Sequence, residues 1–177
     1  MAWTAPMTAV SGSVYTAAQF NQFVRDNLNE TAPAKATTAG AHFAVSGTNE
    51  IAERLSATDI ITTSQDTTST SYTDLATVGP SVTVTTGPRA LVVVRGAISN
   101  SGTGSSRMSY EVSGASSVAA TDSQCVGIFG TAGTGALGGD MSLVTGLTAG
   151  SNTFTAKYRV SSGTGTFSTR RILVFPL

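Results

Sequence analysis

The chain has little charge, one cysteine, one histidine and no long hydrophobic run. Only 11% of its 177 residues are charged, and 10 Lys and Arg balance 10 Asp and Glu, so the formal net charge is zero. Because there is no basic excess to neutralise phosphates, we expect no binding to nucleic acid. The apolar runs, such as Leu91–Val94, are far too short to cross a bilayer, so we expect no membrane partner.

Scarce cysteine and histidine also limit the chemistry available to the chain. Cys125 stands alone and cannot form an intrachain disulfide, and no cluster of His and Cys offers a metal site. The single histidine, His42, lacks the partners of a Ser-His-Asp arrangement. We therefore predict no catalytic residues, no metal, no cofactor and no enzyme activity. The N-terminus has neither a basic nor an apolar segment, so we also expect no signal peptide.

Ser and Thr are abundant where charge is scarce. Together they supply about 29% of the residues, with 19 Gly in addition. This composition favours β-strands joined by tight turns over a bundle of helices. The hydrophobic share of 40% is too high for a long disordered chain.

One helix is predicted near the N-terminus, over residues 17–29. Thr16 followed by Gln19 matches a capping box, and Tyr15 with Phe20 matches a hydrophobic staple. The apolar side chains of the helix share one stripe: Phe20, Phe23, Val24 and Leu28. A helix this short is marginal in water by itself, and the residues after it offer no core. Its stripe must pack on the later domain, on sister chains or on a foreign partner.

A short hairpin is predicted after the helix, over residues 42–55, around a polar turn cluster. Because a lone hairpin is barely stable in water, it too needs neighbours. We group the arm, helix and hairpin as an N-terminal attachment segment, residues 1–56. Residues 57–71 are rich in Ser and Thr with few apolar side chains, and we predict an extended connector there.

Repeated alternation of apolar and polar residues marks the remainder, residues 72–177. About eight strands are expected, near Tyr72 and over residues 82–85, 89–99, 107–112, 125–129, 141–147, 153–160 and 166–176. Regularly spaced strands with Gly-rich turns predict an antiparallel β-sandwich of the jelly-roll kind. The predicted fold class is therefore mainly β, with a short N-terminal helix and a small hairpin before the sandwich.

The last strand is apolar on both of its faces. Ile172 and Val174 point one way, while Leu173 and Phe175 point the other way. One face fits the sandwich core, and the other needs cover from a subunit interface or from elsewhere in the same chain. We take Leu173 and Phe175 as candidate subunit-interface residues. The two arginines at 170–171 either pair with carboxylates of a neighbouring subunit or face solvent.

Several N-terminal stretches together resemble a known family. They are Trp3–Pro6, Gly12, Thr16–Asn21 and Arg25–Leu28. The combination is similar to an N-terminal signature of virion structural proteins from tailed bacteriophages, especially those of actinobacterial hosts. Proteins of this family are called minor tail, tail fibre, head fibre or capsid decoration proteins.

Three further stretches, residues 37–55, 69–85 and 144–160, resemble later segments of the same proteins. One departure is that the family usually has Gly-Asp where this chain has Gly40 and Ala41. The resemblance covers most of the chain. It implies a structural protein without enzyme activity, and often a homotrimer.

The resemblance implies a virion location, on the outer capsid surface or on the tail, after synthesis in the host cytoplasm. Our leading hypothesis is a capsid decoration protein or head fibre that binds the major capsid protein. The candidate residues for attachment or helix packing are Trp3, Pro6, Tyr15, Phe20, Phe23, Val24 and Leu28. One alternative is a minor tail or baseplate protein that contacts tail proteins. Another is a receptor-binding module that holds host-surface glycan through the loop residues Asn100, Tyr110 and Asn152.

Overall fold

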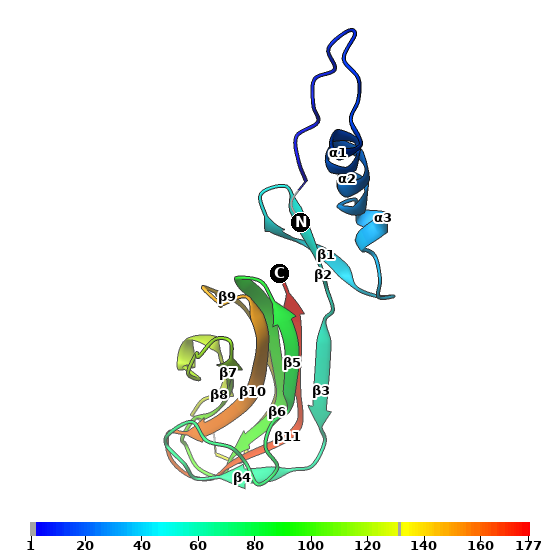
Figure 1. Cartoon of the computed structure of the whole chain (residues 1–177). Coiled ribbons are helices and arrows are strands. Elements are labelled where there is room, and N and C mark those ends of the chain that lie inside the picture. Colours follow the sequence, from blue (N-terminus) through cyan, green and yellow to red (C-terminus); the bar gives the residue numbers. More distant parts are fainter. Residues whose placement is uncertain (1–2, 131) are drawn as a thin grey trace. The chain divides into compact units, whose positions relative to one another are not determined.

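The computed structural model describes residues 3–130 and 132–177, and it divides the chain into two compact units, Met1–Leu55 and Ser56–Leu177. Figure 1 shows the elements of both units. The predicted fold class is confirmed, because the chain is mainly β, with a short helical segment and antiparallel sheets arranged as a sandwich. Within the described residues, no helix is long and apolar enough to cross a membrane.

The N-terminal helix covers the predicted residues 17–29. It consists of α1 (Ala17–Phe20), the π-helical turn η1 (Asn21–Arg25) and α2 (Asp26–Asn29). The Gln19 backbone N–H donates to Thr16 Oγ1 at 3.2 Å, and the Thr16 N–H donates to Gln19 Oε1 at 3.0 Å, which confirms the capping box. The rings of Tyr15 and Phe20 meet edge to face with centroids 6.4 Å apart, as the staple predicts.

A short helix and a hairpin complete the first unit. The helix α3 (Ala32–Lys35) has a proline in its first turn, where a missing N–H costs nothing. The hairpin pairs β1 (His42–Gly47) with β2 (Glu50–Arg54). Glu53 on β2 accepts hydrogen bonds from the Thr37 hydroxyl at 2.6 Å and from the Thr38 N–H at 2.7 Å. These bonds fasten the loop between α3 and β1 to the hairpin.

Two facing sheets form the second unit (Figure 1). Its strands are β3 (Ala57–Ile61), β4 (Gln65–Thr67), β5 (Ser81–Thr86), β6 (Arg89–Asn100), β7 (Ser106–Gly114), β8 (Val126–Ile128), β9 (Gly135–Thr145), β10 (Gly150–Val160) and β11 (Gly165–Pro176), with the 3-10 turn η2 (Asp122–Gln124) before β8. The four-stranded sheet has the order β5-β10-β7-β8. The five-stranded sheet has the order β3-β11-β6-β9, and β4 also pairs with β11. Most successive strands cross from one sheet to the other, which is the strand order of a jelly roll.

The predicted connector over residues 57–71 is wrong in its first part. β3 and β4 lie there and pair with β11, so the segment belongs to the sandwich. Thr and Ile are β-branched and suit a strand, although their polar neighbours hide the pattern. The expected strand near Tyr72 is reduced to a single bridge between Thr73 and Tyr158.

The hydrophobic core lies between the two sheets of the second unit. Its fully buried members include Val92, Val94, Met108, Tyr110, Phe154, Tyr158, Phe167, Ile172 and Val174. In contrast, Asn27 is the one buried residue among the described residues of the first unit, and no hydrophobic side chain there is buried. The second unit therefore carries its own core, and the first unit does not.

Candidate functional site

An arm without regular secondary structure, residues 3–15, turns at Ser11 and Gly12 and leads into the helix of the first unit, and Asn27 fastens the arm to the helix. Asn27 Oδ1 accepts from the Thr4 N–H at 2.8 Å, and Asn27 Nδ2 donates to the Thr4 carbonyl at 2.8 Å. A second bond from Asn27 Nδ2 reaches the Phe23 carbonyl at 3.1 Å. The amide thus pairs with the arm as a neighbouring strand would. Sequence reasoning missed this role because an asparagine in mid-helix gives no such signal.

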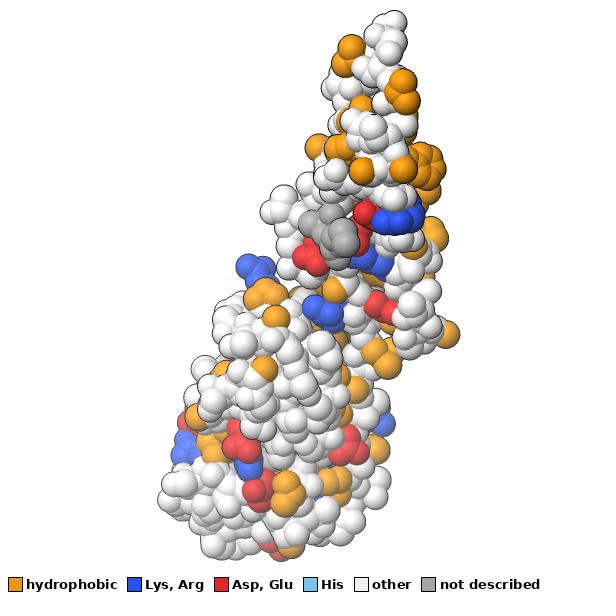
Figure 2. Space-filling model, viewed as in Figure 1, with side chains coloured by type: hydrophobic (Ala, Val, Ile, Leu, Met, Phe, Trp, Pro, Cys, Tyr) orange, Lys and Arg blue, Asp and Glu red, His pale blue; other side chains and the backbone are white. Residues whose placement is uncertain are grey.

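The arm and the helix enclose an apolar hollow of about 270 Å³. It is lined by Trp3, Pro6, Phe23, Val24, Asn27, Leu28 and Thr31. Five of the seven predicted attachment residues therefore meet here, and the other two, Tyr15 and Phe20, contact each other. Much of this apolar surface faces water, since Trp3 is 40% exposed, Phe20 51% and Leu28 60%. Figure 2 shows hydrophobic side chains at the surface of the arm and helix.

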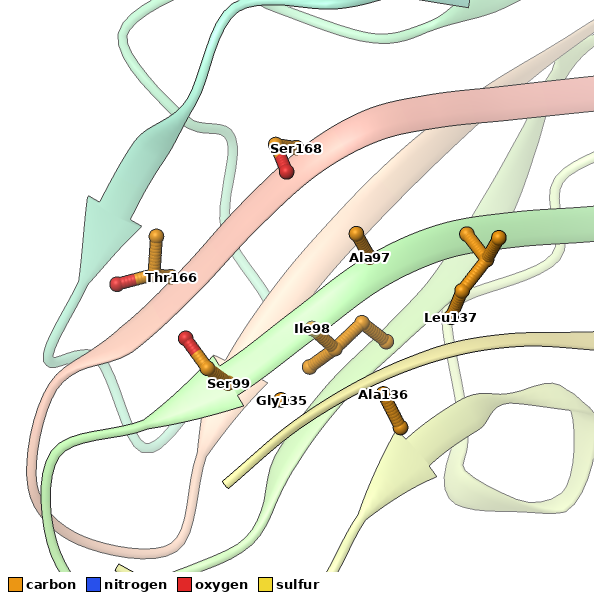
Figure 3. Close-up of a pocket in the computed structure, with 8 residues that line it drawn as sticks. All are labelled: Ala97, Ile98, Ser99, Gly135, Ala136, Leu137, Thr166 and Ser168. Atoms are coloured by element: carbon orange, nitrogen blue, oxygen red, sulfur yellow. The ribbon is translucent and has the colours of Figure 1, made fainter. Parts of the chain in front are cut away.

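A second hollow, of about 320 Å³, lies on the five-stranded sheet. Its lining is Ala97, Ile98, Ser99, Gly135, Ala136, Leu137, Thr166 and Ser168. Figure 3 shows the side chains of Ser99, Thr166 and Ser168 on the same side of β6 and β11. The lining holds hydroxyl and aliphatic groups but neither a charge nor a nucleophile with a base. These groups can make hydrogen bonds and apolar contacts to another surface.

The apolar residues of the last strand, β11, alternate between its two faces, as the sequence predicts. Ile172 and Val174 are fully buried between the sheets. Leu173 and Phe175 are half-buried on the outer face of the five-stranded sheet. Their role in a subunit interface stays a prediction.

The prediction that Asn100, Tyr110 and Asn152 form surface loops for glycan is wrong. All three side chains are buried, with at most 1% of Asn100 exposed. Tyr110 shares a hydrogen bond of 2.7 Å between its hydroxyl and that of Ser142. Each residue stands at a position of its strand that points into the sandwich. Its polar group makes hydrogen bonds inside the sandwich and cannot reach a ligand.

Buried asparagine side chains make hydrogen bonds to polar groups at the ends of the sandwich. Asn100 Nδ2 donates to Ser106 Oγ at 2.9 Å and to the Ser162 carbonyl at 3.1 Å. Asn100 Oδ1 accepts from the Gly102 N–H at 2.8 Å. Because a buried polar group without a partner is costly, these bonds explain why an amide is tolerated in this place.

A charged cluster occupies the outer face of the four-stranded sheet. Asp122 accepts hydrogen bonds from the guanidinium groups of Arg107 and Arg159, and from the Tyr72 hydroxyl at 2.8 Å. The Arg159 guanidinium holds the pKa of the Asp122 carboxyl below its usual value. Burial raises the pKa of the nearby Cys125 thiol, so the thiol stays protonated and unreactive at neutral pH. This cluster fastens η2 to the sheet and offers no catalytic group.

Replacing Asp122 gives a pH-dependent test of this cluster. The folded pKa is lowered, so the contribution of Asp122 is present above the unfolded pKa of about 3.9 and is lost as pH falls through the folded pKa. We expect Asp122→Asn to lower the free energy of unfolding at pH 7 by up to about 1 kcal/mol, because the carboxylate is partly exposed.

Urea denaturation at pH 7 and at pH 3 measures the effect. The gap between the variant and the wild type should narrow at pH 3, and Ser113→Ala, at an exposed side chain on the same sheet, should change little at either pH. An equal gap at both pH values would contradict the role of the Asp122 charge.

Comparisons with known proteins add no family to this picture. A scan of the chain against protein-family models finds no match, and no curated protein matches it either. Over residues 3–130 and 132–177, no group of three or more His, Cys, Asp or Glu is placed to hold a metal ion. The features that remain as candidate binding surfaces are the apolar arm and helix and the outer face of the five-stranded sheet.

Proposed function

We propose that this chain is a structural virion protein of a tailed bacteriophage, and specifically a capsid decoration protein or head fibre. Its N-terminal unit binds the major capsid protein on the outer surface of the shell, and its β-sandwich is displayed as part of a homotrimer. The resemblance of the N-terminal stretches to phage virion proteins supports this proposal. The exposed apolar side chains of the arm and helix also support it, because they offer a contact surface.

The observation that carries the proposal is the missing core of the first unit. The helix over 17–29 is capped and stapled, yet its apolar stripe stays partly open to solvent, with Phe20 51% and Leu28 60% exposed. Burial of apolar area contributes about 25 cal/mol per Å², so covering this stripe with a partner stabilises both the helix and the attachment. Three copies on one lattice would add avidity, because the second and third attachments become intramolecular.

A minor tail or baseplate protein is the alternative, and it uses the same N-terminal surface on tail proteins instead of the shell. The glycan-binding alternative is weaker, because the three residues chosen for it are buried. We therefore do not place a glycan site in the loops of the sandwich.

Deleting residues 1–30 tests the attachment. We expect the truncated protein to fold, because every buried hydrophobic residue in the described part of the chain lies in the second unit, and to be absent from purified particles. The measurement is the amount of protein per particle after complementation of a deletion phage.

A matched pair of point variants sharpens the test. Phe20→Asp changes an aromatic side chain that is 51% exposed on the helix, and Phe129→Asp changes one that is 64% exposed on the sandwich. We expect the first to lose incorporation and the second to keep it. Normal incorporation of the truncated chain would rule out the N-terminal anchor.

A further inference from the structure

The outer face of the five-stranded sheet carries a continuous apolar patch. Residues of β6 alternate, so Val93 points outward between the fully buried Val92 and Val94. The register places Leu173 of β11 and Met141 of β9 on either side of Val93. Leu143, on the next row of β9, also points outward. Met141 is 66% exposed and Leu143 is 53% exposed.

Two arginines lie side by side at the border of this patch. Arg171 of β11 is directly opposite Arg95 of β6, and both are exposed. Like charges directly opposite on neighbouring strands are destabilising. Within the described part of the chain, neither arginine makes an ion pair, whereas Arg107 and Arg159 on the other sheet share Asp122. The pair therefore lacks a carboxylate.

The same face carries one acidic side chain at its other end. Asp66 of β4 is opposite Thr166 of β11, which is opposite Ser99 of β6, so all three point outward. Asp66 is exposed and makes no ion pair with any described residue. At about 3.3 Å per residue, positions 166 and 171 of one strand lie roughly 15 Å apart, too far for Asp66 to neutralise Arg171 in the same chain.

We infer that this face binds a second copy of the chain, with Asp66 of one copy against the Arg95–Arg171 pair of its neighbour. The face carries a carboxylate as well as the two arginines, so Asp66 of a second copy supplies the partner that the arginines lack within their own chain. Its make-up of Met, aliphatic side chains and Arg, without Lys or Glu, is that of an interface centre. Because Asp66 and the arginines lie at different ends, the contact can run head to tail, and it closes as a trimer where successive copies are related by a rotation of about 120°.

The patch forms the centre of a larger contact. Residues 141–143 of β9 span about 10 Å and three strands span about 14 Å, which gives a patch of roughly 140 Å². A stable interface buries about 800 Å² on each partner, so this patch is its apolar centre within a wider rim. The hydroxyl-lined hollow beyond the arginines (Figure 3) extends the same face and supplies part of that rim. The inference rests on the self-assembly included in the proposed function.

Methionine oxidation by hydrogen peroxide tests which surface is covered. In the full chain, Met141 is 66% exposed and Met108 is fully buried, so Met108 is an internal reference. At concentrations where sedimentation velocity shows an oligomer, we expect Met141 to oxidise at least tenfold more slowly than in Leu143→Asp. Val78→Asp, at a side chain that is 60% exposed outside the patch, should keep the protection.

Charge reversal tests the proposed ion pair. Asp66→Arg should weaken self-association at least tenfold, and Arg171→Asp should do the same. Combining Asp66→Arg with both Arg95→Asp and Arg171→Asp in one chain should restore association, because each sign has then changed sides.

The outcomes separate the inference from the proposed function. An oligomer with fully reactive Met141, or a combined variant no better than the single ones, would overturn the inference and leave self-assembly standing. A monomer at every concentration would overturn both the inference and the homotrimer, while attachment to particles is measured separately by the N-terminal deletion.

Discussion

Arg170→Ala is expected to lower the free energy of unfolding by about 3 kcal/mol or more, because it removes the largest fully buried side chain of the sandwich and leaves a cavity. Arg170 Nη2 donates to Gln65 Oε1 at 3.0 Å and to the Thr63 carbonyl at 3.4 Å. Arg170 Nη1 donates to the Gly79 carbonyl at 3.4 Å, and the guanidinium carbon lies 5.3 Å from the centroid of the Tyr158 ring. The side chain thus ties the segment before β5 to the core.

An opposing effect makes a second variant informative. No carboxylate among the described residues pairs with Arg170, so its charge is buried at a cost that Ala would remove. Arg170→Met fills most of the volume without the charge, and we expect it to lose only about half as much stability as Ala.

Urea denaturation of the full chain measures both Arg170 variants. Arg89→Ala is the matched control, because this arginine at the start of β6 is exposed and should change stability by less than about 0.5 kcal/mol. An Arg170→Ala protein as stable as the control would contradict the buried position of the guanidinium.

The second large effect is expected at Asn152. Its side chain is fully buried, where Oδ1 accepts from the Ser116 N–H at 2.7 Å. Its Nδ2 donates to Thr86 Oγ1 at 2.7 Å and to the Thr148 carbonyl at 3.0 Å. Asn152→Ala leaves these buried groups without partners, and we expect a loss of about 3 kcal/mol in the free energy of unfolding.

Two companions make the Asn152 result specific, again by urea denaturation. Asn152→Asp can still accept from the Ser116 N–H but cannot donate to the Thr148 carbonyl, so it should also be strongly destabilised. Ser151→Ala, at the exposed neighbouring position, should have little effect. If Asn152→Ala were as stable as Ser151→Ala, the amide would not hold the 116–118 and 148–150 loops together.

The features that the sequence predicted correctly are mostly local. The capping box of Thr16 and Gln19 and the staple of Tyr15 and Phe20 depend on residues within five positions of one another, and both are present in the structure. The alternation in the long strands likewise predicted the antiparallel sandwich. Short-range rules suffice when the interacting groups are neighbours in the chain.

The predictions for Asn100, Tyr110 and Asn152 were wrong because their polar side chains suggested exposure, whereas the alternation along their strands places them inside. Met108 and Val112 flank Tyr110 on the same phase of β7, and all three are buried. Extending the two-residue period by one step from Ile98 likewise places Asn100 inside. The signal that could have found these residues was in the sequence, because a polar residue on the apolar phase of a strand is one that must be satisfied within the fold.

Long-range pairing explains what could not be predicted. β4 has only three residues, all polar, and its partner β11 lies about 100 positions later in the chain. The bulge between Ser168 and Arg171 shifts the register of β11 against β6, and it decides that Arg171 meets Arg95. Neither composition nor periodicity specifies such a register, so the arginine pair emerges only from the structure.

We propose that many copies of this protein decorate a phage shell. The most direct measurement is the number of copies per virion, by quantitative mass spectrometry of purified particles with the major capsid protein as the internal standard. We expect hundreds of copies, in a fixed proportion to the capsid protein. A few copies, or a few dozen, would contradict shell decoration and would place the protein on the tail, a vertex or the baseplate.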